Sequence, residues 1–304
     1  MIIDPAKKYA GHRIRCFVLC SPLGTNLTNS NPEAPSELLV RMIGRTFYLP
    51  LPGRNLELMD CGDIYSHNFN YLIINKLHIK PEFTLVHHSA SIEGSTLTEI
   101  ETGLLLSENI VPKGKPLIHS LMVKDHYEAL LFVLESAAAK KSITTEFIQQ
   151  INARVMKNTG GLYNTVFGEI DGTKGMFRKG NVSAGGSYFL NYDKVAPYTA
   201  KLAKQLDEHL SSVRGQDEQL KLSFAAHYDL VSIHPFYDGN GRTSRLLMNY
   251  IQAYHELPLA IVFKEDKQEY YTALQETRKQ EDMQVFYTFM FEQYMKHLEQ
   301  ETTS

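Results

Sequence analysis

The residues best suited to chemistry lie in one short stretch, HPFYDGNGRTSR, at positions 234–245. Gly239 and Gly241 permit backbone conformations in which successive N–H groups can bind an anion. Arg242 and Arg245 are three residues apart, so they share one face near the N-terminus of the helix expected to follow. Two guanidinium groups beside a glycine-rich turn at a helix N-terminus are typical of a polyphosphate-binding site.

Two further side chains of this stretch suit phosphate chemistry. Asp238 is a hard oxygen ligand, suited to a Mg²⁺ ion that bridges phosphates. His234 is the candidate general base, because the ordinary pKa of imidazole is near neutrality. Pro235 disfavours helical conformation at His234, so the preceding helix should end there and leave the imidazole facing a cleft. An isolated Asp-Gly-Asn-Gly is usually only a turn; the combination within twelve residues is what favours phosphate chemistry.

The elements that must position this stretch are predicted to be mainly helical. Apolar residues at spacings of three and four predict flanking helices over residues 218–233 and 242–254. Other helices are predicted over residues 83–94, from 96 onward, and over 125–141, 144–156, 195–210, 267–278 and 285–298. Thr96–Glu99 has the form of a capping box, which indicates a helix start.

Two regions depart from this helical pattern. Eight glycines lie between residues 159 and 192 and predict a short β-hairpin. In the first 82 residues, Pro, Gly and Asn separate short apolar stretches. This texture predicts an irregular, short-stranded N-terminal segment (1–82) without an assigned role, followed by a mainly α domain over residues 83–304.

Composition limits the class of protein. The chain has 304 residues, of which 43% are hydrophobic, and 31 Lys and Arg against 34 Asp and Glu give a net charge of −3. This balance argues against a dedicated nucleic-acid binder. Only three cysteines are present, Cys16, Cys20 and Cys61, which excludes a disulfide scaffold and favours a reducing compartment. No apolar run approaches the roughly 18 residues of a membrane span, so we expect a cytoplasmic protein without a membrane partner.

The 234–245 stretch resembles the Fic-family signature, H-x-F-x-D/E-G-N-G-R-x-x-R, and agrees with it at every defined position. The resemblance covers roughly residues 83–295. It implies a Fic-like helical bundle with a β-hairpin flap. It also implies a nucleotidyltransferase, a protein adenylyltransferase (AMPylase) that transfers AMP from ATP to a hydroxyl of a target protein and releases diphosphate.

The same resemblance implies a role for each position of the signature. His234 would deprotonate the target hydroxyl, and Asp238 would bind Mg²⁺ or Mn²⁺ between the α- and β-phosphates. Phe236 would anchor the loop in the core. The residues implied to bind ATP are Gly239, Asn240, Gly241, Arg242 on the phosphate chain and Arg245 on the γ-phosphate.

A second stretch, Ser89 to Gly94, resembles the inhibitory helix motif of this family, S/T-x-x-x-E-G/N. The resemblance implies that Glu93 pairs with Arg245, a favourable contact between carboxylate and guanidinium. The carboxylate would take the place of the γ-phosphate and hold ATP unproductively. Ser89, Glu93 and Gly94 are therefore the expected inhibitory residues, on a helix at about 83–94.

A third segment falls where the family has its flap, a hairpin that pairs with an extended stretch of the target by strand addition. The expected flap residues are Arg178, Val182, Ser183, Ala184, Gly185 and Gly186. Such a flap would present the target hydroxyl to His234.

Other functions stay open on the sequence alone. Some relatives use the same inhibitory glutamate to position water and remove AMP from modified proteins, so a de-AMPylase is one alternative. A non-catalytic nucleotide-binding regulatory module is another, against which the intact His234, Asp238 and Arg242 argue. The identity of the target protein, self-modification and a homodimer are not decided by the sequence.

Overall fold

The computed structural model describes residues 37–42, 45–50, 80–184 and 187–303. The chain divides into two compact units, 1–74 and 75–304. In the first unit, strands β1 (Glu37–Met42) and β2 (Arg45–Pro50) pair antiparallel. The three cysteines lie outside the described residues, as does most of the predicted N-terminal segment.

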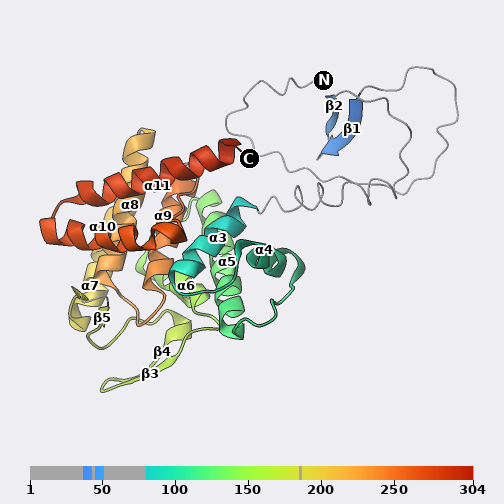
Figure 1. The fold of residues 1–304 in the computed structure, drawn as a ribbon. Helices are drawn as coiled ribbons and strands as arrows, with labels where there is room; N and C mark the ends of the chain where they lie inside the picture. The colour runs from blue at the N-terminus through green and yellow to red at the C-terminus, as the bar shows by residue number, and fades with distance from the viewer. Residues whose placement is uncertain (1–36, 43–44, 51–79, 185–186, 304) are drawn as a thin grey trace, which may run out of the picture. The chain divides into compact units, whose positions relative to one another are not determined.

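The second unit is built from helices, so the predicted mainly α fold is confirmed (Figure 1). The helices are α3 (Pro81–Ile92), α4 (Glu99–Glu108), α5 (Leu117–Ala138), α6 (Thr145–Val155), α7 (Tyr192–Leu210), α8 (Gln216–Ile233), α9 (Asn240–Tyr254), α10 (Lys267–Gln280) and α11 (Met283–Thr303). Two short 3₁₀ turns, η1 (Gly172–Lys174) and η2 (Lys264–Asp266), join some of them. Within the described residues, the helices are too short or too polar to cross a membrane.

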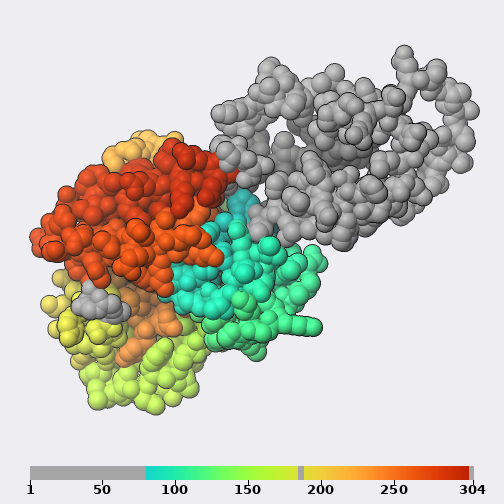
Figure 2. All heavy atoms as spheres, viewed as in Figure 1, coloured from blue at the N-terminus to red at the C-terminus, as the bar shows by residue number. Residues whose placement is uncertain are grey.

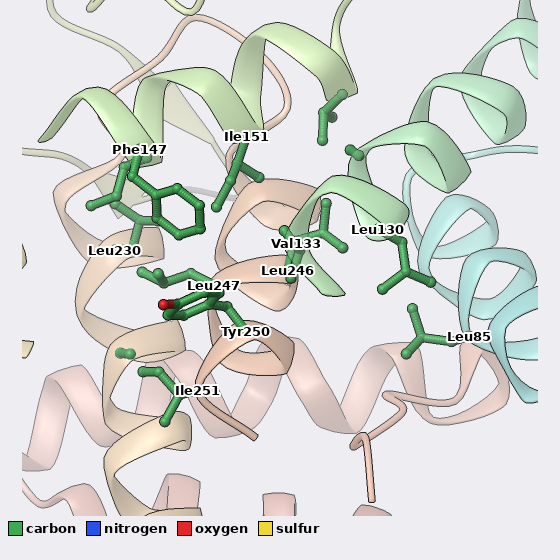
Figure 3. Close-up of a cluster of buried hydrophobic side chains, with 14 of the residues drawn as sticks. Leu85, Leu130, Val133, Phe147, Ile151, Leu230, Leu246, Leu247, Tyr250 and Ile251 are labelled. Carbon is green, nitrogen blue, oxygen red and sulfur yellow. The ribbon is translucent and has the colours of Figure 1, made fainter. Parts of the chain in front are cut away.

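Helix α9 is the centre of the core, and it begins inside the chemical stretch. Its side chains from Thr243 to Gln252 are buried, and α5, α6 and α8 pack around it. Figure 3 shows Leu246 of α9 next to Val133 of α5, and the same apolar cluster contains Leu247 and Ile251 of α9 and Ile151 of α6. Burial of each such aliphatic side chain stabilises the fold by about 1.5–3 kcal/mol. The start of α9 is therefore held rigidly by the packing of its other turns.

A second apolar cluster joins α8 to the C-terminal helices. Phe224 of α8, Met248 of α9 and Phe286 of α11 belong to it, and so does Ile92 at the end of α3. In Figure 2 the orange and red surface of α10 and α11 adjoins the cyan surface of α3 on the face in view. The end of α3 is thereby fixed next to the start of α9.

The helices start within three residues of the sequence expectation, except α5, and the capping box at the start of α4 is formed by a different pair. Helix α5 begins already at Leu117, because Pro116 fixes the entry to the helix while its first apolar residues remain exposed and give no periodic signal. The capping box is formed by Thr98 and Glu101 rather than by Thr96 and Glu99. The Thr98 hydroxyl accepts from the Glu101 N–H at 3.2 Å, whereas the Thr96 hydroxyl lies 3.0 Å from His119 Nδ1.

The glycine-rich region contains two hairpins where one was predicted. Strands β3 (Leu162–Thr165) and β4 (Gly168–Asp171) form the first, which projects from the helices in Figure 1. Strands β5 (Ser183–Ala184) and β6 (Ser187–Tyr188) form the second. The glycines are spread over the whole region, so their number did not indicate how many hairpins it contains.

Candidate functional site

Helix α8 ends at His234, which adopts a left-handed backbone conformation with φ 54° and ψ 61°. Pro235 disfavours the helical alternative at this position. The N–H of His234 still donates to the Leu230 carbonyl at 3.0 Å, so the histidine terminates the helix. Its imidazole Nδ1 donates to the Val231 carbonyl at 3.3 Å, which leaves Nε2 as the nitrogen that can accept a proton.

Burial lowers the pKa of His234 to about 4. The ring of Phe189 stacks on the imidazole with centroids 3.9 Å apart and an angle of 17° between the planes, and this contact keeps water from one face. His234 is therefore neutral at pH 7, as a general base must be. The spacing of the sequence gave no indication of Phe189.

The loop after His234 is closed by its own polar groups. The side chain of Asn240 accepts from the Phe236 N–H and donates to the Phe236 carbonyl, each at 2.9 Å. Asn152 of α6 donates to the Asp238 carbonyl and to the Thr243 hydroxyl, each at 3.1 Å. The Asn240 amide thus shapes the loop, and Asn152 supports it from a helix that the motif does not include.

Two loop residues are shaped by their close neighbours. Phe236 is buried against Phe177. Gly239 has φ 77°, and a Cβ there would lie 2.7 Å from Met156 Sδ. The loop can approach α6 this closely only with glycine at this position.

Arg245 and Glu93 meet across the start of α9. Arg245 Nη2 donates to Glu93 Oε1 at 2.7 Å and to the Ser89 carbonyl at 3.1 Å, while Nε donates to the Ser89 hydroxyl at 2.8 Å. Burial alone would raise the pKa of Glu93, but the charges of Arg245 and Arg242 outweigh it and hold that pKa below its usual value. Glu93 is therefore an ionised carboxylate at the positive end of a helix.

The approach of Glu93 depends on two glycines. A Cβ on Gly241 would lie 2.3 Å from Glu93 Oε1, so only glycine admits the carboxylate here. Gly94, with φ 102°, turns the chain directly after the helix end. The residues that the inhibitory motif predicts are brought together with Arg245.

Arg242 lies differently from Arg245. Its side chain is 2% exposed and points toward the end of α6, with Nη1 3.4 Å from the Val155 carbonyl and Nη2 3.3 Å from Met156 Sδ. It is absent from the lining of the cavity next to Arg245. In this conformation Arg242 packs between the loop and the end of α6 and adds positive potential to the site, but its guanidinium does not face the cavity.

A cavity of about 660 Å³ joins these groups, within the size range of ligand pockets. It is lined by Glu93, Phe189, Val231, His234, Tyr237, Asp238, Gly239, Asn240, Gly241, Arg245, Gln268, Tyr270, Tyr271, Leu274, Gln275 and Arg278. The residues from 268 to 278 supply one face of α10, which the signature does not predict. The cavity is therefore bounded by the N-terminus of α9 with Arg245 on one side, a cradle that suits an anion, and by a mixed apolar and polar wall on α10.

Asp238 is the candidate metal ligand. Its side chain is 56% exposed, and Oδ1 lies 3.8 Å from Arg242 Nη2 and accepts from the Gly239 N–H. Among the described residues, no three His, Cys, Asp or Glu side chains gather as a metal site. Mg²⁺ is commonly held by one or two carboxylates together with substrate phosphates, and an exposed carboxylate beside an anion cradle fits that mode.

The predicted flap residues are found in two different environments. Arg178 is 1% exposed and bonds only to main-chain carbonyls, so it cannot contact a target protein as expected. Ser183 is exposed on β5, and Val182 is half-buried. Gly185, Gly186 and the side chain of Ala184 lie outside the described residues. Arg178 is more buried than Val182 and Ser183 because it precedes the hairpin and faces the loop of His234.

Comparison with known proteins agrees with this geometry. The sequence profile of the Fic/DOC family matches residues 142–252. Proteins named Protein adenylyltransferase Fic from Drosophila erecta and Drosophila melanogaster are each 31% identical over 269 residues, which is 87% of this chain and 51% of the relative. The chain thus spans about half the length of these curated relatives.

Solved structures share the fold. Fic-1 from C. elegans is 24% identical, with a TM-score of 0.62 over 80% of this chain and 70% of that chain. A Fic domain containing signaling protein from Bacteroides thetaiotaomicron is 22% identical, with a TM-score of 0.55 over 68% of this chain and 80% of that chain. Residues 142–252 of this chain, which include the loop at His234, thus match the Fic/DOC family, and the helical fold around them is similar to that of these Fic structures.

Proposed function

We propose that this chain transfers AMP from ATP to a hydroxyl group of a protein. The observation that carries this proposal is the placement of a neutral histidine and an arginine-flanked helix N-terminus in one cavity. The names of the Drosophila relatives support it. The cavity offers a base for the acceptor hydroxyl and a cradle for a triphosphate, which are the two requirements of such a transfer.

The transfer needs one proton movement and one exchange of bonds at phosphorus. His234 Nε2 takes the hydroxyl proton as the acceptor oxygen forms a bond to the α-phosphorus. The bond between the α-phosphorus and the bridging oxygen breaks, and diphosphate leaves. The N–H groups at the start of α9 and the guanidinium of Arg245 would stabilise negative charge on the phosphates. Mg²⁺ or Mn²⁺ held by Asp238 would neutralise charge on the triphosphate.

The chain is autoinhibited in this proposal. Glu93 occupies the cradle at the start of α9 and pairs with Arg245 at 2.7 Å. A γ-phosphate that approached Arg245 would meet the Glu93 carboxylate and be repelled. ATP would then bind in a position where its α-phosphorus is not aligned with the acceptor hydroxyl.

The test uses the Glu93→Gly protein, cell lysate and two labelled forms of ATP. We expect protein-bound label from ATP labelled at the α-phosphate and none from ATP labelled at the γ-phosphate, because AMP is the transferred group. Mass spectrometry of the labelled bands identifies the target and the modified residue, including any on the chain itself. His234→Ala in the same background is the control and should give no label. Label from the γ-phosphate would instead indicate phosphoryl transfer and contradict the proposal.

Removal of AMP from a modified protein is the second candidate, because Glu93 and His234 line the same cavity and a carboxylate there could orient water. Adenylylated protein from the first experiment, incubated with the unmodified chain without ATP, distinguishes the two. Release of AMP that requires Glu93 would favour removal, and stable modification would favour transfer.

The three cysteines fit a reducing compartment, and we propose that the reaction takes place in the cytoplasm.

A further inference from the structure

A single buried guanidinium connects the catalytic histidine to the β5–β6 hairpin. Arg178 Nε donates to the carbonyl of His234 at 2.7 Å, and its own N–H donates to the carbonyl of Pro235 at 3.0 Å. The His234 carbonyl is turned out of the helical direction by the left-handed backbone of that residue. Non-glycine residues hold this conformation only where their surroundings fix it. The contact to Arg178 is one of the interactions that fix it.

The other two nitrogens of the same guanidinium hold both ends of the hairpin segment. Nη1 donates to the Gly180 carbonyl at 2.8 Å, and Nη2 donates to the Leu190 carbonyl. The segment between these carbonyls contains β5, β6 and Phe189, the residue that stacks on the His234 imidazole. Both ends of the hairpin and the backbone of the histidine are therefore bonded to one planar group.

Arg178 is well suited to this position by its shape. Within the described part of the chain, no carboxylate lies within ion-pair distance of it, and its bonds go to neutral carbonyls. A charged group without a counter-ion is unfavourable in a protein interior unless its donors are all occupied. The rigid fork of a guanidinium reaches three acceptors in different directions, whereas a lysine ammonium acts as a compact point charge.

We propose that Arg178 is a positioning residue, which fixes the hairpin relative to His234 so that the base and the hydroxyl presented along the hairpin stay aligned. This inference rests on the proposed adenylyl transfer. Arg178 touches neither the anion cradle nor the α10 wall of the cavity. Its loss should therefore reduce turnover and leave the affinity for the nucleotide unchanged.

The experiment compares Arg178→Lys with Lys179→Met, both in the Glu93→Gly background. Lys179 is the exposed neighbour of Arg178 on the same segment. For Arg178→Lys we expect about 100-fold lower turnover, since misplacement of reacting groups by about 1 Å has an effect of that size. The dissociation constant of a non-hydrolysable ATP analogue should change by less than about two-fold, as turnover and binding respond separately when only alignment is lost. Lys179→Met should match the parent in both measurements.

The outcomes separate this inference from the proposed function. If the Glu93→Gly parent transfers no AMP, the proposed function fails. If the parent is active and Arg178→Lys is equally active, the inference is wrong. A parallel loss of turnover and nucleotide affinity would indicate a general structural role and would also overturn it.

If Arg178→Lys does not fold, hydrogen exchange measured on the unmodified protein tests the inference instead. The amides of Arg178, Phe189 and Tyr192 donate to Pro235, Val182 and Asn181 respectively, so both ends of the hairpin segment should exchange slowly. The exposed tip of the β3–β4 hairpin around Val166 is the internal reference for fast exchange. If the amides at either end of the segment exchanged as fast as the amides at that tip, the segment would not be fixed in place. This result would contradict the inference.

Discussion

The carboxylate of Glu93 and the guanidinium of Arg245 lie 2.7 Å apart, although 152 positions separate them in the sequence. The pair joins the C-terminal end of α3 to the N-terminal end of α9. Glu93 thereby places a negative charge where the helix N–H groups are unpaired, which is the preferred place for an anion. The protein supplies an internal anion at the site where a phosphate would bind.

Replacing Glu93 by glycine should increase self-modification with α-labelled ATP. Coupling between an internal inhibitor and a ligand site is typically about 1–3 kcal/mol, so the expected increase is about 5- to 150-fold. Glu108→Gly is the matched control, because Glu108 is an exposed glutamate near the end of another helix. Equal labelling of the two variants would rule out the inhibitory role.

Replacing Ser89 by alanine should release the inhibition in part. The variant loses the bond of 2.8 Å from Arg245 Nε and keeps the carboxylate. Arg245 also keeps its bond to the Ser89 carbonyl, so labelling should rise by less than in Glu93→Gly. Ser91→Ala, two residues further along α3, is the control and should stay at the parent level. A full release by Ser89→Ala would mean that the serine, and not the carboxylate, carries the inhibition.

The pH dependence of turnover should follow the imidazole of His234. Its pKa is lowered to about 4 by burial, so the neutral, proton-accepting form predominates above that pH and disappears below it. In the Glu93→Gly background, turnover should stay level from pH 8 down to about pH 5 and then fall. Phe189→Ala, which uncovers the ring, should move the acid limb upward, toward the usual imidazole pKa of about 6.5. An unmoved acid limb in that variant would show that stacking does not set this pKa.

Asp238 should be needed for metal-dependent transfer and dispensable for folding. Its side chain is 56% exposed, so Asp238→Asn keeps the shape at the surface and removes the negative charge that a divalent cation requires. We expect turnover to need a higher Mg²⁺ concentration in the variant, with an unchanged midpoint of thermal unfolding. Chelation by EDTA should stop transfer by the parent. A variant with the Mg²⁺ dependence of the parent would remove Asp238 from the metal site.

Buried histidines should make the fold sensitive to mild acid. Burial lowers the pKa of His87 and His88 to about 4 and that of His227 to about 3, below the value of about 6.5 in the unfolded chain. Between pH 6.5 and 4 the unfolded state binds more protons, so each such histidine reduces the free energy of unfolding by about 1.4 kcal/mol per pH unit as the pH falls. Urea unfolding at pH 7.5 and 5.5 measures this loss.

The matched variants for that measurement are His227→Gln and His209→Gln. His227 is fully buried and His209 is exposed, so only the first should flatten the dependence on pH. If the free energy of unfolding depended equally on pH in both variants, the buried histidine would not be the cause of the acid sensitivity.

The chemical loop could be predicted from the sequence because its chemistry is local. Twelve contiguous residues specify the loop, the helix start and the base, and the periodic apolar residues specify most of the helices. Phe189 and Asn152 could not be found in this way, since each reaches the loop from a separate element and has no spacing that relates it to His234. Arg178 was expected to face a target protein and its side chain is instead buried, because burial is decided by tertiary packing.

The helix that carries Glu93 is also part of the core. Leu85, Val86 and Ala90 of α3 are buried in the same apolar cluster as Leu130 and Leu246. Swinging the whole helix away would uncover these side chains to water, whereas rotation about the side-chain torsions of Glu93 would leave them in place. If Glu93 inhibits the site as proposed, release of the inhibition would require the displacement of one side chain only, while the helix that precedes it stays in the core.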